Sequence, residues 1–141
     1  MRIMAIDYGD AHTGIAVSDP TGLLAGFTTV INAYRPDRVT EQIALLAKEH
    51  RVERLVLGHP INMDGTRGPR SEKAQAMRQL LKETTGLPVV LWDERRTTID
   101  AHQILMSSGK NAKKRKKVVD AVAASLILEG YLTYLKTHPE G

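Results

Sequence analysis

Apolar residues along the chain fall into short runs separated by turn-forming sequences, a pattern that predicts strands. Gly9 and Gly14 lie between the first two runs, and Asp19-Pro20-Thr21-Gly22 precedes the third. Two later runs are short, apolar and bounded by polar stretches, as in buried strands. The predicted strands are residues 2–6, 13–18, 23–31, 55–57 and 89–92.

Helical periodicity accounts for most of the remaining chain. Pro36 can open a helix that runs to about His50, and Ser71 can cap a second helix that ends at Gly86. A third helix is predicted from Thr97 or Thr98 to Gly109, and an apolar fourth helix covers residues 118–135.

The predicted element order is β-β-β-α-β-α-β-α-α. Three antiparallel strands followed by alternating strands and helices imply a mixed five-stranded sheet with helices on both faces. This topology matches the ribonuclease H-like α/β fold, which hosts many functions. Residues 1–141 contain no internal repeat or linker and are expected to form a single domain.

Composition narrows the setting in which the protein works. The chain has no cysteine, which excludes disulfides and thiolate metal sites and is compatible with a reducing compartment. The first apolar run is interrupted at Asp7, too early for a signal peptide, and no apolar stretch is long enough to cross a bilayer. We therefore expect a soluble, cytoplasmic protein.

Positive charge is concentrated in one segment. The formal net charge is +4, from 20 Lys and Arg against 16 Asp and Glu. Lys110 and residues 113–117 supply six of these positive charges, and without them the balance is fourteen positive against sixteen negative. Such a run is often only a solvated loop, but its place before the last helix favours contact with phosphates. We expect residues 110–117 to form a mobile loop that becomes ordered on nucleic acid.

Acidic residues stand where predicted elements begin or end. Asp7 ends the first strand, Asp93 and Glu94 follow the strand at 89–92, and Asp120 lies in the first turn of the last helix. Asp120 alone is also explained by the helix dipole, and Asp93 by an ion pair with Arg95. Because side chains alternate along a strand, only one of Asp93 and Glu94 can share a face with Asp7. Together the acids suggest an oxygen-ligand site for Mg²⁺ or Mn²⁺.

Several segments in a fixed order resemble the YqgF family of RuvC-like, ribonuclease H-fold proteins. They are Met4-Ala5-Ile6-Asp7-Tyr8-Gly9, Gly14-Ile15-Ala16-Val17-Ser18-Asp19, Leu57-Gly58-His59-Pro60, Asn62-Met63-Asp64-Gly65-Thr66, Asp93-Glu94-Arg95 with Thr97-Thr98, and Lys114-Arg115-Lys116-Lys117-Val118-Val119-Asp120-Ala121. Members are described as Holliday junction resolvases and as nucleases that mature the end of pre-16S ribosomal RNA. The resemblance spans almost the whole chain and implies that Asp7, Glu94 and Asp120 are the catalytic acids and metal ligands, with Asp93 in reserve. The chain departs from the family pattern at His12, His59 and Arg96, where arginine, leucine and a hydrophobic residue are usual.

The resemblance implies a metal-dependent nuclease that processes the 5′ end of pre-16S ribosomal RNA. We expect the protein to bind structured RNA or branched DNA and to be a monomer or weak homodimer. A Holliday junction resolvase, which requires a two-fold dimer, and a non-catalytic nucleic-acid binder are the alternatives. An ATPase of the actin and sugar-kinase type is disfavoured because 141 residues supply only one of its two domains. Candidate phosphate contacts are Arg67, Arg95, Lys113, Lys114, Arg115, Lys116 and Lys117.

Overall fold

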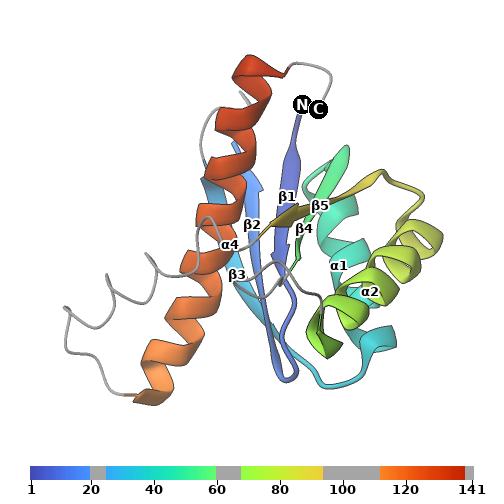
Figure 1. Cartoon of the computed structure of the whole chain (residues 1–141), viewed down its shortest axis with the longest axis vertical. Helices are drawn as coiled ribbons and strands as arrows, with labels where there is room; N and C mark the ends of the chain where they lie inside the picture. The colour runs from blue at the N-terminus through green and yellow to red at the C-terminus, as the bar shows by residue number, and fades with distance from the viewer. Residues whose placement is uncertain (20–24, 60–67, 94–111, 139–141) are drawn as a thin grey trace.

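A five-stranded mixed sheet forms the centre of the computed structural model (Figure 1). The structure describes residues 1–19, 25–59, 68–93 and 112–138, and of 112–121 only the backbone. The strands are β1 (Ile3–Asp7), β2 (His12–Ser18), β3 (Ala25–Asn32), β4 (Arg54–His59) and β5 (Val89–Asp93). The helices are α1 (Pro36–Glu49), α2 (Pro69–Thr85) and α4 (Ala112–Thr137). The predicted α/β fold class is confirmed.

The sheet has the strand order β3-β2-β1-β4-β5, with β1 in the middle. β1 pairs antiparallel with β2 and parallel with β4, so that Ile6 lies beside both Ile15 and Leu57. Short loops suffice for antiparallel neighbours, whereas the parallel strands are reached through the crossovers that contain α1 and α2. The carboxyl ends of β1, β4 and β5 consequently lie at one edge of the sheet.

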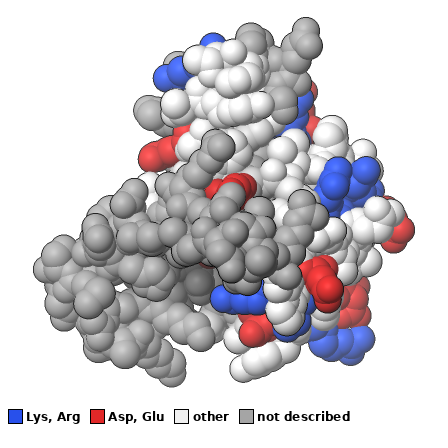
Figure 2. Space-filling model, in the orientation of Figure 1, with Lys and Arg blue, Asp and Glu red and all other residues white. Residues whose placement is uncertain are grey.

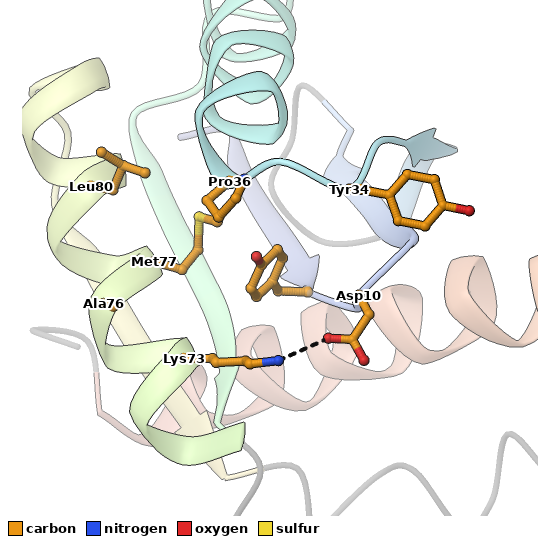
Figure 3. A pocket seen from close by; sticks show the side chains of 8 residues that line it. Asp10, Tyr34, Pro36, Lys73, Ala76, Met77 and Leu80 are labelled. Atoms are coloured by element: carbon orange, nitrogen blue, oxygen red, sulfur yellow. Dashed lines mark hydrogen bonds and ion pairs between the residues drawn. The ribbon is translucent and has the colours of Figure 1, made fainter. Parts of the chain in front are cut away.

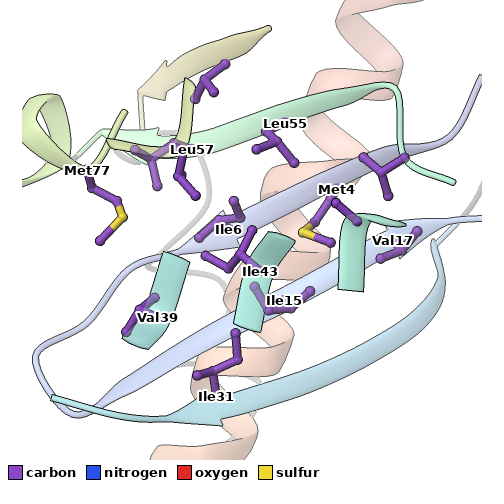
Figure 4. Packing of buried hydrophobic residues seen from close by; sticks show 14 of the residues in the cluster. Met4, Ile6, Ile15, Val17, Ile31, Val39, Ile43, Leu55, Leu57 and Met77 are labelled. Atoms are coloured by element: carbon purple, nitrogen blue, oxygen red, sulfur yellow. The ribbon is translucent and has the colours of Figure 1, made fainter. Parts of the chain in front are cut away.

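Helices α1 and α2 pack on one face of the sheet (Figure 1). Val39, Ile43 and Ala47 recur at intervals of four along α1 and are buried, because this spacing places them on one side of the helix. Pro36 occupies the start of α1, as predicted. Figure 4 shows Val39 and Ile43 of α1 packed among alternate side chains of the strands, including Met4, Ile6, Ile15, Val17, Leu55 and Leu57.

Among the described helices, only α4 covers the other face. Its buried residues Ala124, Ile127, Leu128 and Tyr131 pack against small side chains of the sheet, including Ala5 and Ala16. Trp92 of β5 meets the ring of Tyr131 edge to face, with the ring centroids 6.0 Å apart. Among the described helices, none combines the length and the hydrophobicity that a membrane-spanning segment requires.

Two predicted boundaries were wrong. Helix α2 begins at Pro69 with Gly68 as its N-cap, so Ser71 lies inside the first turn instead of capping it. It ends as predicted, with Gly86 in the left-handed conformation at φ 71°. The prediction of a mobile loop at 110–117 is wrong for residues 112–117, which form the first turns of α4. The helix predicted to end at Gly109 lies outside the described residues.

The helical basic segment has a simple physical explanation. Alanine, lysine and arginine are strong helix formers, and no glycine or proline interrupts the chain between Ala112 and the apolar part of α4. Repulsion between like charges one turn apart costs only a few tenths of a kcal/mol per pair, roughly 0.2–0.5 kcal/mol. Extending an existing helix avoids a second nucleation step, so helix formation outweighs this repulsion.

Candidate metal and nucleic-acid site

Asp7 ends β1 on the face of the sheet that α4 covers. Side chains alternate along a strand, and Met4 and Ile6 belong to the core beneath α1 and α2, whereas Ile3 and Ala5 belong to the core beneath α4. Asp7 is the next residue of the second set and is half-buried. The sequence prediction of an acid at the rim of the sheet is therefore confirmed, and the structure adds which face it occupies.

Glycines flank Asp7 on both neighbouring strands. Gly14 of β2 is its direct partner in the antiparallel register. On the other side, the parallel register ends at Ile6 and Leu57, and the next residue of β4 is Gly58. Neither neighbour contributes a side chain to the α4 face of the sheet. On this face of the sheet, the carboxylate of Asp7 therefore has no side chain from the adjacent positions of β2 and β4 beside it.

Asp93 ends β5 on the opposite face from Asp7. Trp92 packs in the core beneath α4, so the adjacent Asp93 belongs to the side of α1 and α2. Its register partner on β4 is His59, whose ring bonds to α2 on that side. Asp93, the alternative metal ligand to Glu94, is therefore on the opposite side of the sheet from Asp7.

The remaining members of the predicted acid set lie beyond what the structure describes. Glu94 lies outside the described residues, and Asp120 is placed only by the backbone of α4. Within the described part of the chain, no group of three metal-ligating side chains occurs. Arg67, Arg95 and Arg96 are outside the description, and of Lys113, Lys114, Arg115, Lys116 and Lys117 only the helical backbone is described. The three-acid site and its phosphate contacts stay predictions.

Two histidines that depart from the family pattern have local partners. His12 Nδ1 lies 2.6 Å from Asn32 Oδ1 at the paired ends of β2 and β3, in an exposed position. His59 is only 6% exposed, and its Nε2 lies 2.6 Å from Ser71 Oγ. A leucine at position 59 would not form this bond. Ser71, expected from the sequence to be a helix cap, instead ties α2 to the end of β4.

A pocket opens on the side of the sheet that α1 and α2 cover (Figure 3). One of its lining residues is Tyr8, which follows Asp7 in the chain but lies on the opposite face of the sheet. Its polar residues are Tyr8, Asp10, Lys73 and Tyr34. Lys73 Nζ donates to Asp10 Oδ1 over 3.3 Å. Burial raises the pKa of the Tyr8 phenol, Lys73 lowers it and Asp10 raises it, so the phenol is a hydrogen-bond donor at neutral pH. The sequence patterns did not indicate this pocket, because Asp10 and Lys73 are far apart in the chain.

On the face of the molecule shown in Figure 2, the described residues include both positively and negatively charged side chains. Figure 2 shows lysines and arginines interspersed with acids over the α1 and α2 side. This mixture agrees with the sequence, in which removal of the six basic residues at 110–117 leaves a slightly negative balance.

Comparison with known proteins gives the family. A family model for RuvX, described as a Holliday junction resolvase, matches residues 1–134. The chain belongs to the RuvX family. This RuvX-family chain is 44% identical over 134 residues to a protein of Halothermothrix orenii named "Putative pre-16S rRNA nuclease", covering 95% of this chain and 96% of the relative. A relative with the same name from Desulfitobacterium hafniense is 42% identical over 136 residues, covering 96% and 94% of the two chains. The resemblance to the YqgF family that the sequence motifs indicated is confirmed, and both relatives are named as nucleases, which are enzymes.

Solved structures confirm the fold of this RuvX-family member. RuvC of Thermus thermophilus in complex with a Holliday junction substrate superposes with a TM-score of 0.61 at 14% identity, covering 97% of both chains. The Fowlpox virus resolvase, in complex with Holliday junction DNA, gives a TM-score of 0.54 at 10% identity over 98% of this chain and 99% of that one. At these identities the similarity establishes the ribonuclease H-like fold alone.

Proposed function

We propose that the protein is a divalent-metal-dependent nuclease that hydrolyses phosphodiester bonds in pre-16S ribosomal RNA at its 5′ end. The observation that carries the proposal is the placement of Asp7 at the carboxyl end of the central strand, between two glycine positions on the α4 face. Membership of the RuvX family and the names of its relatives support the class of reaction. We place the reaction in the cytoplasm, where ribosomal RNA is matured.

Glu94 is the proposed second acid, since the pleat of β5 favours it over Asp93. Trp92 and Asp93 occupy opposite faces of the sheet, and Trp92 shares the α4 face with Asp7. If the alternation of β5 continues by one residue, position 94 returns to the face of Asp7. The structure of the described strand thus supports Glu94 as ligand and Asp93 as a residue of the other side.

Position 120 is the proposed source of the third acid, and the direction of α4 supports it. Arg54 is level with Ile3 at the start of β1, and its Nη1 donates to the Tyr131 hydroxyl over 2.8 Å. From Ile3 to Asp7 the strand advances by about 13 Å, at roughly 3.3 Å per residue. Helix α4 runs antiparallel to β1 (Figure 1), and it covers that distance in about nine residues at roughly 1.5 Å each. Residues near position 122 of α4 are then level with Asp7.

The helical repeat supports the same residue. Ala124, Ile127 and Tyr131 form the stripe of α4 that is buried against the sheet. Position 120 precedes them by four, seven and eleven residues, which are the intervals that return to one side of a helix. We therefore expect Asp120 to lie on the sheet-facing side of α4, one turn before Ala124.

The donor set suits a hard cation. Asp7, Glu94 and Asp120 offer only carboxylate oxygens, which Mg²⁺ and Mn²⁺ prefer, and the chain contains no cysteine. A pair of such ions would supply Lewis acidity for phosphodiester hydrolysis. Asp7, at the end of the central strand, would hold the ions together with Glu94 and Asp120. The protein's own part is to hold these carboxylates in place and to bring a phosphate to them.

A Holliday junction resolvase is the second candidate, because the family model carries that description. A resolvase must cut two strands symmetrically, which requires a two-fold dimer. We place RNA processing first because the relatives that match nearly the whole chain are named for it.

The experiment compares wild type with Asp7→Asn on two labelled substrates, a precursor 16S ribosomal RNA fragment and a four-way DNA junction. We expect the wild type to cut the RNA at one position only when Mg²⁺ or Mn²⁺ is present, and Asp7→Asn to be inactive. Without metal, Asp7→Asn should melt at the same or a slightly higher temperature, because a repelling charge is removed. Mg²⁺ should raise the melting temperature of the wild type more than that of the variant.

Asp93→Asn is the matched control, since it makes the same chemical change on the opposite face of the sheet. We expect it to retain cleavage, and loss of cleavage as complete as in Asp7→Asn would show that Glu94 is the wrong choice. Cutting of the junction but not of the RNA would favour the resolvase. A wild type whose melting is indifferent to metal, together with a metal-free Asp7→Asn that melts clearly lower, would sink the metal site.

A further inference from the structure

The pocket on the α1 and α2 side has a volume of about 340 Å³ and lies apart from the proposed metal site. Ligand pockets start at roughly 300 Å³, so this one has room for a single small molecule such as a nucleoside. Figure 3 shows Ala76, Met77 and Leu80 of α2 on one side, with Pro36 above and Tyr34 opposite. Apolar walls of this kind suit a flat, weakly polar ring.

The polar groups at the opening are a cation and an anion side by side. Lys73 and Asp10 form an ion pair at 3.3 Å in which both side chains are largely exposed, 61% and 79%. An exposed pair of this kind contributes little to stability, about 0–1 kcal/mol, so it can open at little cost when a ligand enters. The Lys73 ammonium group offers hydrogen-bond donors, and the neighbouring Asp10 carboxylate offers two acceptor oxygens.

We propose that this pocket binds one unpaired nucleobase of the substrate strand, with guanine preferred. The pairing edge of guanine has an acceptor, O6, next to two donors, N1–H and the 2-amino group. Lys73 complements the acceptor and the Asp10 carboxylate complements the two donors. This proposal rests on the proposed function, because it names a feature of the substrate that the nuclease would recognise. Recognition of unstacked bases by their pairing edge is the common route to sequence preference in RNA.

Tyr34 gives the base a stacking partner. The residue is 81% exposed, which is unusual for a large aromatic residue, and it stands at the opening near Asp10 (Figure 3). Stacking on an aromatic side chain favours every base, since each base has a π face. Tyr34 is therefore expected to supply affinity, and the Lys73 and Asp10 pair to supply the preference for guanine.

The pocket is placed to act with the metal site. Tyr8, which lines it, follows Asp7 directly, and the two residues belong to opposite sides of the sheet. A strand that crosses the edge of the sheet can present a phosphate to Asp7 and insert a neighbouring base beside Tyr8. The bound base would then fix which phosphodiester bond reaches the metals.

The test is calorimetric titration of the full chain with GMP, IMP, AMP and inorganic phosphate, in EDTA. IMP differs from GMP only in lacking the 2-amino group, and we expect it to bind about tenfold more weakly, the value of one good base contact. Asp10→Asn should weaken GMP binding about tenfold and abolish the difference between GMP and IMP. Tyr34→Ala should weaken all three nucleotides by a similar factor.

Glu83→Gln is the matched control for Asp10→Asn, because it neutralises another exposed acid at the far end of α2. It should leave GMP binding unchanged. Absence of GMP binding at millimolar concentration, equal binding of GMP and IMP, or displacement of GMP by inorganic phosphate would each overturn the proposal. The titration involves neither metal nor cleavage, so its outcome is independent of whether Asp7→Asn abolishes nuclease activity.

Discussion

Gly9 lies in the loop between β1 and β2, two residues after Asp7 and directly before Asp10, and its replacement by alanine should destabilise the protein. A Cβ at this position would overlap the backbone carbonyl oxygen of His12, inside the 3.0 Å that real Cβ atoms essentially never cross. The obstacle is backbone, which does not rotate away as a flexible side chain would. The glycine is thus needed for space.

The loop has little freedom to relieve this overlap. Ala33 N donates to Ala11 O over 3.1 Å, and His12 Nδ1 lies 2.6 Å from Asn32 Oδ1, so both residues are tied to the end of β3. Overpacking of a fixed region costs about 1–3 kcal/mol. Alanine also restricts the unfolded chain, which offsets about 0.4–1 kcal/mol of that cost. The expected net loss of unfolding free energy for Gly9→Ala is about 1–2 kcal/mol.

Urea denaturation followed by circular dichroism measures the loss as a lower midpoint at unchanged slope. The matched control is Gly26→Ala in β3, where a Cβ would lie 3.1–3.3 Å from atoms of Asp19. A shift of a few tenths of an ångström relieves these contacts, so this variant should stay within about 0.5 kcal/mol of wild type after the gain from the unfolded state. The reasoning is refuted if Gly9→Ala is as stable as wild type, or if Gly26→Ala loses more.

Two further predictions concern α4. Tyr131→Phe removes the acceptor of a bond from Arg54 Nη1 and should cost about 1–3 kcal/mol in the same assay, whereas Tyr34→Phe at an exposed position should change stability by less than about 0.5 kcal/mol. Replacing Lys113, Lys114, Lys116 and Lys117 with glutamine should keep α4 helical, weaken binding to all RNA sequences alike and flatten the dependence of affinity on salt, by roughly 0.7–0.9 per lost phosphate contact. An unchanged salt slope would place the phosphate contacts elsewhere.

Local patterns in the sequence were sufficient to predict the sheet. Short apolar runs and their glycine-rich or polar boundaries identify the strands β1 to β5, because burial of a strand requires such runs. The position of Asp7 at the end of β1 followed from the same reasoning. The face on which Asp7 lies did not, since that depends on which helices cover which side of the sheet.

The errors arose where two local preferences compete. Residues 112–117 repel one another, which favours a loop, but they are also good helix formers next to a helix, and this second effect is the larger. Ser71 has a capping side chain, yet proline at position 69 is a better first residue, and the serine hydroxyl instead bonds to the buried His59. The partner of Ser71 comes from β4, and no local pattern contains that information.

The alternation of side chains along β1 unites the two proposals. Asp7 and Tyr8 are neighbours in the chain, but one belongs to the α4 side and the other to the α1 and α2 side. A site that holds metal needs several carboxylates close together, whereas the proposed base pocket has apolar walls and a single carboxylate, that of Asp10, at its opening. The sheet separates them while keeping them one residue apart. A substrate strand lying across this edge would therefore be held by its phosphate on one face and by its base on the other.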